Sequence, residues 1–129
     1  MKVIQQALAK YWGHNDFLPL QKEAMASLNR GQDCILVLPT GGGKSLCYQA
    51  PAMVMGGLTV VVSPLISLMK DQVDALVECG VSAMRLDSSM STDEQKETLD
   101  YIRQGEVKLL YLSPERLLTD GFMDLLKKT

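Results

Sequence analysis

The stretch CILVLPTGGGKS, from Cys34 to Ser45, places three consecutive glycines between an apolar run and a Lys-Ser pair. The apolar run, Cys34–Leu38, predicts a strand buried on both faces, and the residues from about Lys44 onward predict a helix. Glycine leaves room for a phosphate to approach, and successive backbone N–H groups form a nest for an anion. The N–H groups at the start of the helix favour the same kind of ligand. We therefore predict a phosphate-binding loop between a strand and a helix.

Each residue of this loop has an expected contact with the ligand. Lys44 supplies a cation for the β- and γ-phosphates of ATP, and the Ser45 hydroxyl is placed to hold Mg²⁺. These two are the candidate catalytic residues. The remaining nucleotide-binding residues of the loop are Pro39, Thr40, Gly41, Gly42 and Gly43. Leu38 stands where the general phosphate-loop pattern has glycine, and the alternative is a glycine-rich turn with an incidental Lys-Ser pair.

Strands and helices alternate along the rest of the chain. Further apolar runs predict strands at Leu58–Ser63, Met84–Asp87 and Lys108–Ser113, of which the first and the last should be buried on both faces. Helices are predicted at Pro19–Asn29, at Ile66–Cys79, and from a capping box at Ser91 to near Gln104. The apolar face of the second helix consists of Met69, Val73, Leu76 and Val77. This order predicts an α/β fold with a mostly parallel sheet and right-handed crossovers.

A parallel sheet brings the carboxyl ends of its strands to one edge, where ligands bind. The segments that follow the four predicted strands should therefore line that edge; they are Thr40–Ser45, Pro64–Leu68, Ser88–Met90 and Pro114–Arg116.

The composition excludes several classes of protein. The 129 residues suit one domain, and a formal net charge of -2 gives no overall basic surface for nucleic acid, so any DNA contact must be local. Three scattered cysteines show neither a disulfide framework nor metal-ligand spacing, and no apolar stretch is long enough to span a membrane. We expect a cytoplasmic protein, associated with the nucleoid if the source is bacterial.

Four longer stretches resemble the motifs of RecQ-type DNA helicases of superfamily 2, in the order that this family requires. They are YWGHNDFLPLQKEAM at 11–25, PTGGGKSLCYQAP at 39–51, VVVSPLISLMKDQV at 60–73 and LLYLSPERLL at 109–118. The resemblance implies a RecA-like P-loop NTPase with three α/β/α layers, incomplete at its C-terminus. Residues 1–30 would form a helical segment with the adenine-reading motif, and 31–129 part of the ATP-binding domain. It also implies 3′ to 5′ DNA unwinding driven by ATP with Mg²⁺, in repair and recombination.

The resemblance assigns Gln21 to the adenine base and Ser63, Pro64, Leu65 and Ser67 to the backbone of single-stranded DNA. The family has arginine where Leu18 stands and often an aromatic residue at His14, so we expect weaker ATP affinity or relaxed base selectivity. Two alternatives stay open. The first is that Ser63 or Ser67 merely caps a helix instead of contacting DNA. The second concerns Arg116, which could either reach a phosphate or form an ion pair with Glu115 or another acid. For Arg116 the ion pair, a structural role, is favoured.

The family's acidic motif II and second motor domain do not occur in this sequence. We therefore expect this polypeptide alone to hydrolyse ATP barely and not to unwind DNA, and to be marginally stable because of an exposed sheet edge. Two other functions compete with a helicase portion. One is a stand-alone nucleotide- or DNA-binding module. The other is a different P-loop enzyme, such as a kinase. This second alternative is disfavoured by Leu38, which replaces the glycine of the general phosphate-loop pattern, and by the later motifs.

Overall fold

The computed structural model describes residues 2–14, 16–17, 20–35, 45–119 and 121–127. It divides into two compact units, Met1–Gly56 and Gly57–Thr129, each of which is considered by itself. The expected boundary between the helical segment 1–30 and the ATP-binding segment 31–129 stays a prediction. Most of the predicted phosphate loop and the end of its preceding strand, 36–44, lie outside the described residues. Cys34 and Ile35, at the start of that predicted strand, are not in a strand, since no described backbone pairs with them.

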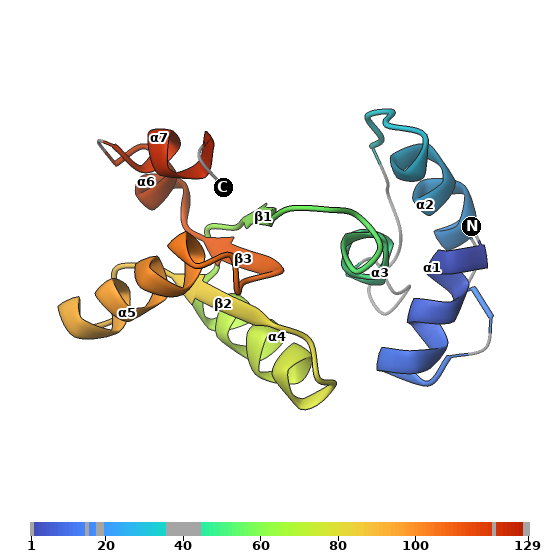
Figure 1. Cartoon of the computed structure of the whole chain (residues 1–129), viewed down its shortest axis with the longest axis horizontal. Helices are drawn as coiled ribbons and strands as arrows, with labels where there is room; N and C mark the ends of the chain where they lie inside the picture. Colours follow the sequence, from blue (N-terminus) through green and yellow to red (C-terminus); the bar gives the residue numbers. More distant parts are fainter. Residues whose placement is uncertain (1, 15, 18–19, 36–44, 120, 128–129) are drawn as a thin grey trace. The chain divides into compact units, whose positions relative to one another are not determined.

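The second unit contains a parallel sheet of three strands, β1 (Thr59–Val62), β2 (Ala83–Leu86) and β3 (Leu109–Leu112), in the order β1-β3-β2 (Figure 1). The three apolar runs thus form strands within a residue or two of the predicted bounds. Helix α4 (Ile66–Glu78) connects β1 to β2, and α5 (Thr92–Arg103) connects β2 back to β3. These two connections cross the sheet in opposite directions, so right-handed crossovers place the two helices on opposite faces. The predicted α/β fold with a parallel sheet is confirmed.

One face of this sheet packs against α5 and two short helices, α6 (Pro114–Leu117) and α7 (Phe122–Lys127). Alternate residues of a strand point to opposite faces, which explains why Leu110 and Leu112 of β3 share this core with Leu86 of β2. Its other buried members are Ile102, Val107 and Phe122.

The outer strand β1 is less buried than its apolar sequence predicts. Val62 is 46% exposed, whereas all four residues of the central strand β3 are buried. The expectation that Leu58–Ser63 is buried on both faces is therefore wrong in this structure. The reason is position, because β1 has a partner only on its β3 side among the described residues.

Helices α4 and α5 test two patterns read from the sequence. Met69, Val73 and Leu76 are buried as expected, but Val77 is 56% exposed, so its place on the apolar face is corrected. The capping box of α5 is confirmed, because the Ser91 hydroxyl accepts from the Glu94 N–H and the Glu94 carboxylate accepts from the Ser91 N–H.

The first unit consists of helices around a small core. They are α1 (Lys2–Ala7), the π-helical segment η1 (Leu8–Trp12), α2 (Gln21–Asn29) and α3 (Leu46–Ala52). Ile4, Leu8, Met25 and Ala50 form the core, with Trp12 packed against it. Within the described ranges, every helix is too short or too polar to cross a lipid bilayer.

Candidate functional site

Three polar side chains stand at one level along the carboxyl edge of the sheet. Val62 and Leu86, the last residues of β1 and β2, are both in register with Leu112, the last residue of β3. The next residues of these strands are Ser63, Asp87 and Ser113. We call these three the strand-end row. As predicted, the chain therefore leaves the sheet at the same edge in three segments, Pro64–Leu68, Ser88–Met90 and Pro114–Arg116.

Each residue of the strand-end row fixes the backbone that follows it. The N–H of Leu65 donates to Oγ of Ser63 (3.2 Å), and the N–H of Ser89 donates to Oδ1 of Asp87 (2.8 Å). At the third position the N–H of Arg116 donates to Oγ of Ser113 (3.4 Å). In all three turns a side-chain oxygen at the end of a strand thus accepts a hydrogen bond from a backbone N–H two or three residues later. These turns lie at the edge where an open α/β sheet binds ligands.

The first of these turns contains the residues predicted to contact DNA. Pro64, Leu65 and Ser67 are exposed and Ser63 is half-buried. Leu65 is the N-cap residue of α4, and none of the side chains that the structure describes caps this helix end. The Ser63 hydroxyl instead accepts the hydrogen bond from the Leu65 N–H. Helix capping therefore does not account for a serine at position 63 or 67. The turn presents a hydroxyl and the positive end of a 13-residue helix, which together suit an anion.

The second turn is organised around a buried carboxylate that the sequence motifs did not single out. Asp87 is fully buried, and its Oδ2 lies 2.7 Å from Nη1 of Arg85. Its Oδ1 also accepts a short hydrogen bond from the Ser89 hydroxyl. Burial by itself raises the pKa of Asp87, but the hydrogen bonds from Ser89 and Arg85 and the charge of Arg85 outweigh it, so the pKa is lowered. The one sequence signal for this pair is its spacing, since residues two apart on a strand face the same side.

The third turn leads into α6 and places Arg116 against an aromatic ring. The guanidinium of Arg116 lies 5.6 Å from the centre of the Phe122 ring. Among the described residues Arg116 forms no ion pair with Glu115 or another acid, and its Nε atom has no hydrogen-bond partner. It lines a cavity of about 210 Å³ between α5 and α7. This packing supports a structural role for Arg116.

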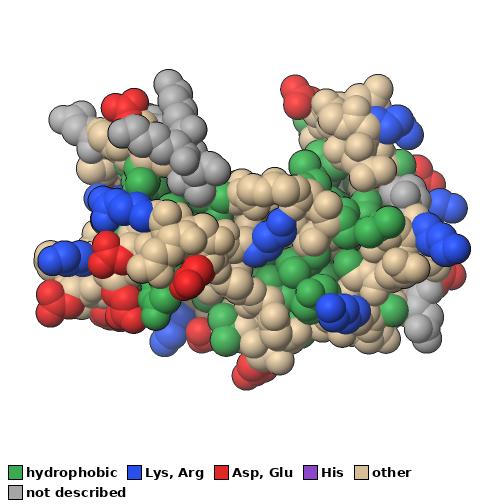
Figure 2. Space-filling view, viewed as in Figure 1, with side chains coloured by type: hydrophobic (Ala, Val, Ile, Leu, Met, Phe, Trp, Pro, Cys, Tyr) green, Lys and Arg blue, Asp and Glu red, His purple; other side chains and the backbone are tan. Residues whose placement is uncertain are grey.

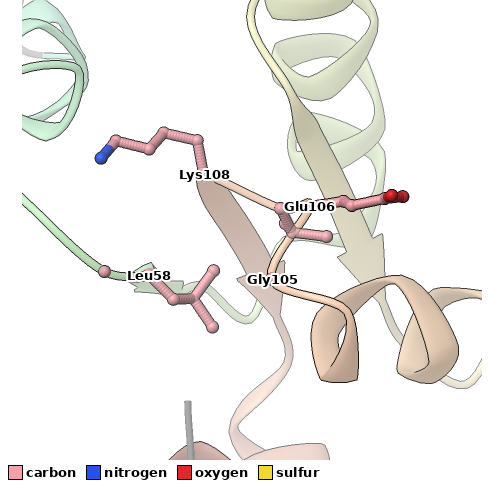
Figure 3. A pocket seen from close by; sticks show the side chains of 6 residues that line it. Leu58, Gly105, Glu106 and Lys108 are labelled. Carbon is pink, nitrogen blue, oxygen red and sulfur yellow. The ribbon is translucent and has the colours of Figure 1, made fainter.

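A larger cavity of about 320 Å³ lies at the opposite, amino end of the strands. Its lining comes from the residues just before β1 and β3, and Figure 3 shows the side chains of Glu106 and Lys108 extending away from one another. None of the predicted site residues that the structure describes lines this cavity.

In the first unit, two predicted nucleotide-binding residues are described. Gln21 is the first residue of α2, where it is 1% exposed. Ser45 is the N-cap residue of α3, but its side chain does not cap that helix. His14 is exposed. The positions of Leu18, of Pro39 to Gly43 and of Lys44 lie outside the described residues, so their roles stay predictions.

On the face shown in Figure 2, basic and acidic side chains are interspersed. No continuous basic patch is visible among the described residues of that face, in keeping with the net charge of -2. No group of three or more Asp, Glu, His or Cys side chains among the described residues could hold a metal ion.

Comparison with protein families gives one match over most of the chain. Residues 18–128 match the family described as DEAD/DEAH box helicase. A protein of Synechocystis sp. named ATP-dependent DNA helicase RecQ is 46% identical over 125 residues, which are 97% of this chain and 26% of that protein. The protein of the same name from Bacillus subtilis is 46% identical, over 95% of this chain and 21% of its own length. The chain thus spans about a quarter or less of the curated relatives it matches.

Two solved structures resemble the fold. A hypothetical ATP-dependent RNA helicase from Sulfolobus tokodaii superposes with a TM-score of 0.70 at 21% identity, covering 98% of this chain and 36% of that one. The DUF1998 helicase MrfA, bound to DNA, gives a TM-score of 0.72 at 22% identity over 91% of this chain and 17% of that one. At such identities the likeness supports the fold alone.

Proposed function

Since this chain belongs to the DEAD/DEAH box helicase family, we propose that it is the ATP-binding portion of a RecQ-type DNA helicase. The observation that carries the proposal is the 46% identity to a protein named ATP-dependent DNA helicase RecQ over 97% of the chain. The activity proposed for the whole protein is ATP-driven unwinding of DNA in the 3′ to 5′ direction, in repair and recombination.

The nucleotide is proposed to bind at the loop Pro39–Ser45, with Gln21 reading the adenine base. Lys44 would neutralise the phosphates. ATP supplies the phosphoryl group and the free energy of its transfer. Ser45 stands at the N-cap of α3, where its hydroxyl would hold Mg²⁺ together with the phosphates of the nucleotide.

Single-stranded DNA is proposed to lie along the carboxyl edge of the sheet, at Ser63, Pro64, Leu65 and Ser67. Hydroxyls and backbone N–H groups bind phosphate oxygens without reading sequence. The exposed Ser67 and the end of α4, which lacks a side-chain cap, offer such donors together. An overall charge of -2 makes the local arrangement of these donors decisive.

The experiment that tests nucleotide binding is calorimetry of the 129-residue chain with Mg-ADP, beside a Lys44→Ala variant. We expect binding by the original chain and its loss in the variant, because the cation for the phosphates is gone. A folded chain that binds no Mg-ADP, or a variant that binds it equally well, would overturn the proposed role of the loop.

A further inference from the structure

We propose that the cavity between α5 and α7 binds a small carboxylic acid, whose carboxylate is held by Arg116 and Arg103 and whose apolar body fills the remainder. The proposal is independent of the nucleotide and DNA sites proposed above. It gives a role to a cavity that none of the sequence motifs explains.

The cavity combines apolar walls with cationic side chains. It encloses about 210 Å³. Its apolar walls are Leu99, Phe122 and Leu125, which also belong to the core on one face of the sheet. The volume is below the roughly 300–1,000 Å³ of sites for drug-sized ligands, so a fitting ligand is about as large as one amino-acid side chain.

Arg116 is a cation without an acidic partner in the part of the chain that the structure describes. Its Nε atom is buried, and no described acceptor forms a hydrogen bond with it. The guanidinium is held by packing instead, 5.6 Å from the centre of the Phe122 ring. A cation taken partly out of water without a counter-ion is costly, and an anion that binds beside it removes part of that cost.

Arg103 brings a second cation to the same cavity. Its Nη1 lies 3.1 Å from Oδ1 of Asp100, but the side chains of this pair are 58% and 54% exposed. An ion pair so exposed contributes little to stability, so Arg103 can turn toward a ligand at small cost. Arg116 is therefore the fixed cation of the cavity, and Arg103 is the adaptable one.

The apolar walls favour a carboxylate over inorganic phosphate. A guanidinium can donate two parallel hydrogen bonds to either anion. Phosphate, however, has polar oxygens on every side, and those facing the apolar walls would lose water without gaining a donor. A monocarboxylate has its charge at one end only, and its apolar body gains from burial against the same walls.

The test is a titration of the 129-residue chain with benzoate, followed by the NMR shifts of the backbone amides. We expect the signals of Thr119, Gly121 and Leu125 to move, because these residues line the cavity. A millimolar Kd is expected, as ligand-efficiency limits allow for so small a molecule. Benzamide has the same shape and no charge, and should bind about tenfold more weakly. Inorganic phosphate should also bind about tenfold more weakly, because it has no apolar body to bury.

Two variants test the cations. Arg116→Met keeps an apolar side chain beside Phe122 and should weaken benzoate binding about tenfold. Arg103→Met should weaken it about threefold, because Arg103 is more exposed. The matched control is Arg30→Met, which removes an exposed arginine of the first unit and should leave the affinity unchanged. Melting temperatures show whether each variant folds. If Arg116→Met does not fold, Arg103→Met and the comparison of benzoate with benzamide decide.

Asp120 follows Thr119 in the sequence and lies outside the described residues. The variant Asp120→Asn therefore tests whether the chain supplies its own carboxylate to the cavity. We expect this variant to bind benzoate as the original chain does. Benzoate binding that occurs only in Asp120→Asn would assign the cavity to Asp120 and overturn the proposal.

Three other results would also overturn it. They are the absence of benzoate binding to the original chain, binding of benzamide or phosphate as tight as that of benzoate, and unchanged affinity in folded Arg116→Met. Each of these results would leave the proposed helicase function standing, because none of the proposed nucleotide- or DNA-binding residues lines this cavity.

Discussion

Nη1 of Arg85 and Oδ2 of Asp87 lie 2.7 Å apart at the end of β2, although Arg85 is partly exposed and Asp87 is completely buried. A buried carboxylate is costly unless it is paired and hydrogen-bonded, and Arg85 and Ser89 together meet that need. The ion pair is therefore a structural support for the turn that follows β2.

Replacing Arg85 by methionine should destabilise the chain, because the carboxylate of Asp87 would stay buried without its cation. We expect the free energy of unfolding to fall by about 2 kcal/mol, less than the roughly 3–5 kcal/mol of a fully buried pair, since Ser89 still donates to Asp87. Urea denaturation measures this. Arg103→Met is the control, because its pair with Asp100 is more than half exposed and should contribute no more than about 0.5 kcal/mol. Equal effects of the two variants would contradict this assignment.

The stability of the chain should depend on pH through Asp87. The pKa of this carboxyl is held below its ordinary value of 3.8, so its contribution is complete above that value and is lost as pH falls through the lower folded pKa. Urea denaturation at pH 6 and at pH 3 should therefore show a larger loss for the original chain than for Asp87→Asn, which has no carboxyl to titrate at this position. Identical losses would show that Asp87 does not carry this dependence.

Local patterns in the sequence predicted the elements well because their causes are local. The apolar run at Leu109–Leu112 became the central strand, and the spacing of Ser91 and Glu94 produced the capping box. The exposure of Val62 could not be read in the same way. Whether a strand lies at the centre or the edge of a sheet depends on the strand order, which links residues far apart in the sequence.

The candidate site was only partly visible in the sequence for a similar reason. Ser63 and Ser67 were identified because they stand in a motif, whereas Asp87 stands in none. Its burial and its bonds to Arg85 and Ser89 arise from the turn after β2 and from the register that aligns it with Ser113. Their spacing of two on a strand could have indicated that Arg85 and Asp87 share a face, but not that this face would bury one of them.

Two serines at the N-terminal ends of helices should respond differently to alanine. Ser91→Ala removes the capping box of α5 and should lower the free energy of unfolding by about 1 kcal/mol. Ser67→Ala touches an exposed residue at a helix end without a side-chain cap, and should change stability by less than about 0.5 kcal/mol. Under the proposed function, only Ser67→Ala should weaken oligo-dT binding. Thermal unfolding and anisotropy on the same samples separate the effects, and a Ser67 variant that loses stability instead of affinity would contradict the proposed contact.

Neighbouring residues Leu76 and Val77 provide a final test of how α4 meets the sheet. At about 100° per residue, Leu76 and Val73 lie within about 40° of Met69 around the helix, while Val77 lies about 80° away, at the margin of the apolar stripe. Accordingly Leu76 is 2% exposed and Val77 is 56% exposed. We expect Leu76→Ala to lower the free energy of unfolding by about 2–5 kcal/mol through lost burial and a residual cavity. Val77→Ala should cost under about 0.5 kcal/mol, because valine at an exposed position loses little contact and alanine is the better helix former. Urea denaturation of both variants measures the difference, and a large cost at Val77 would indicate that another surface covers this side of α4.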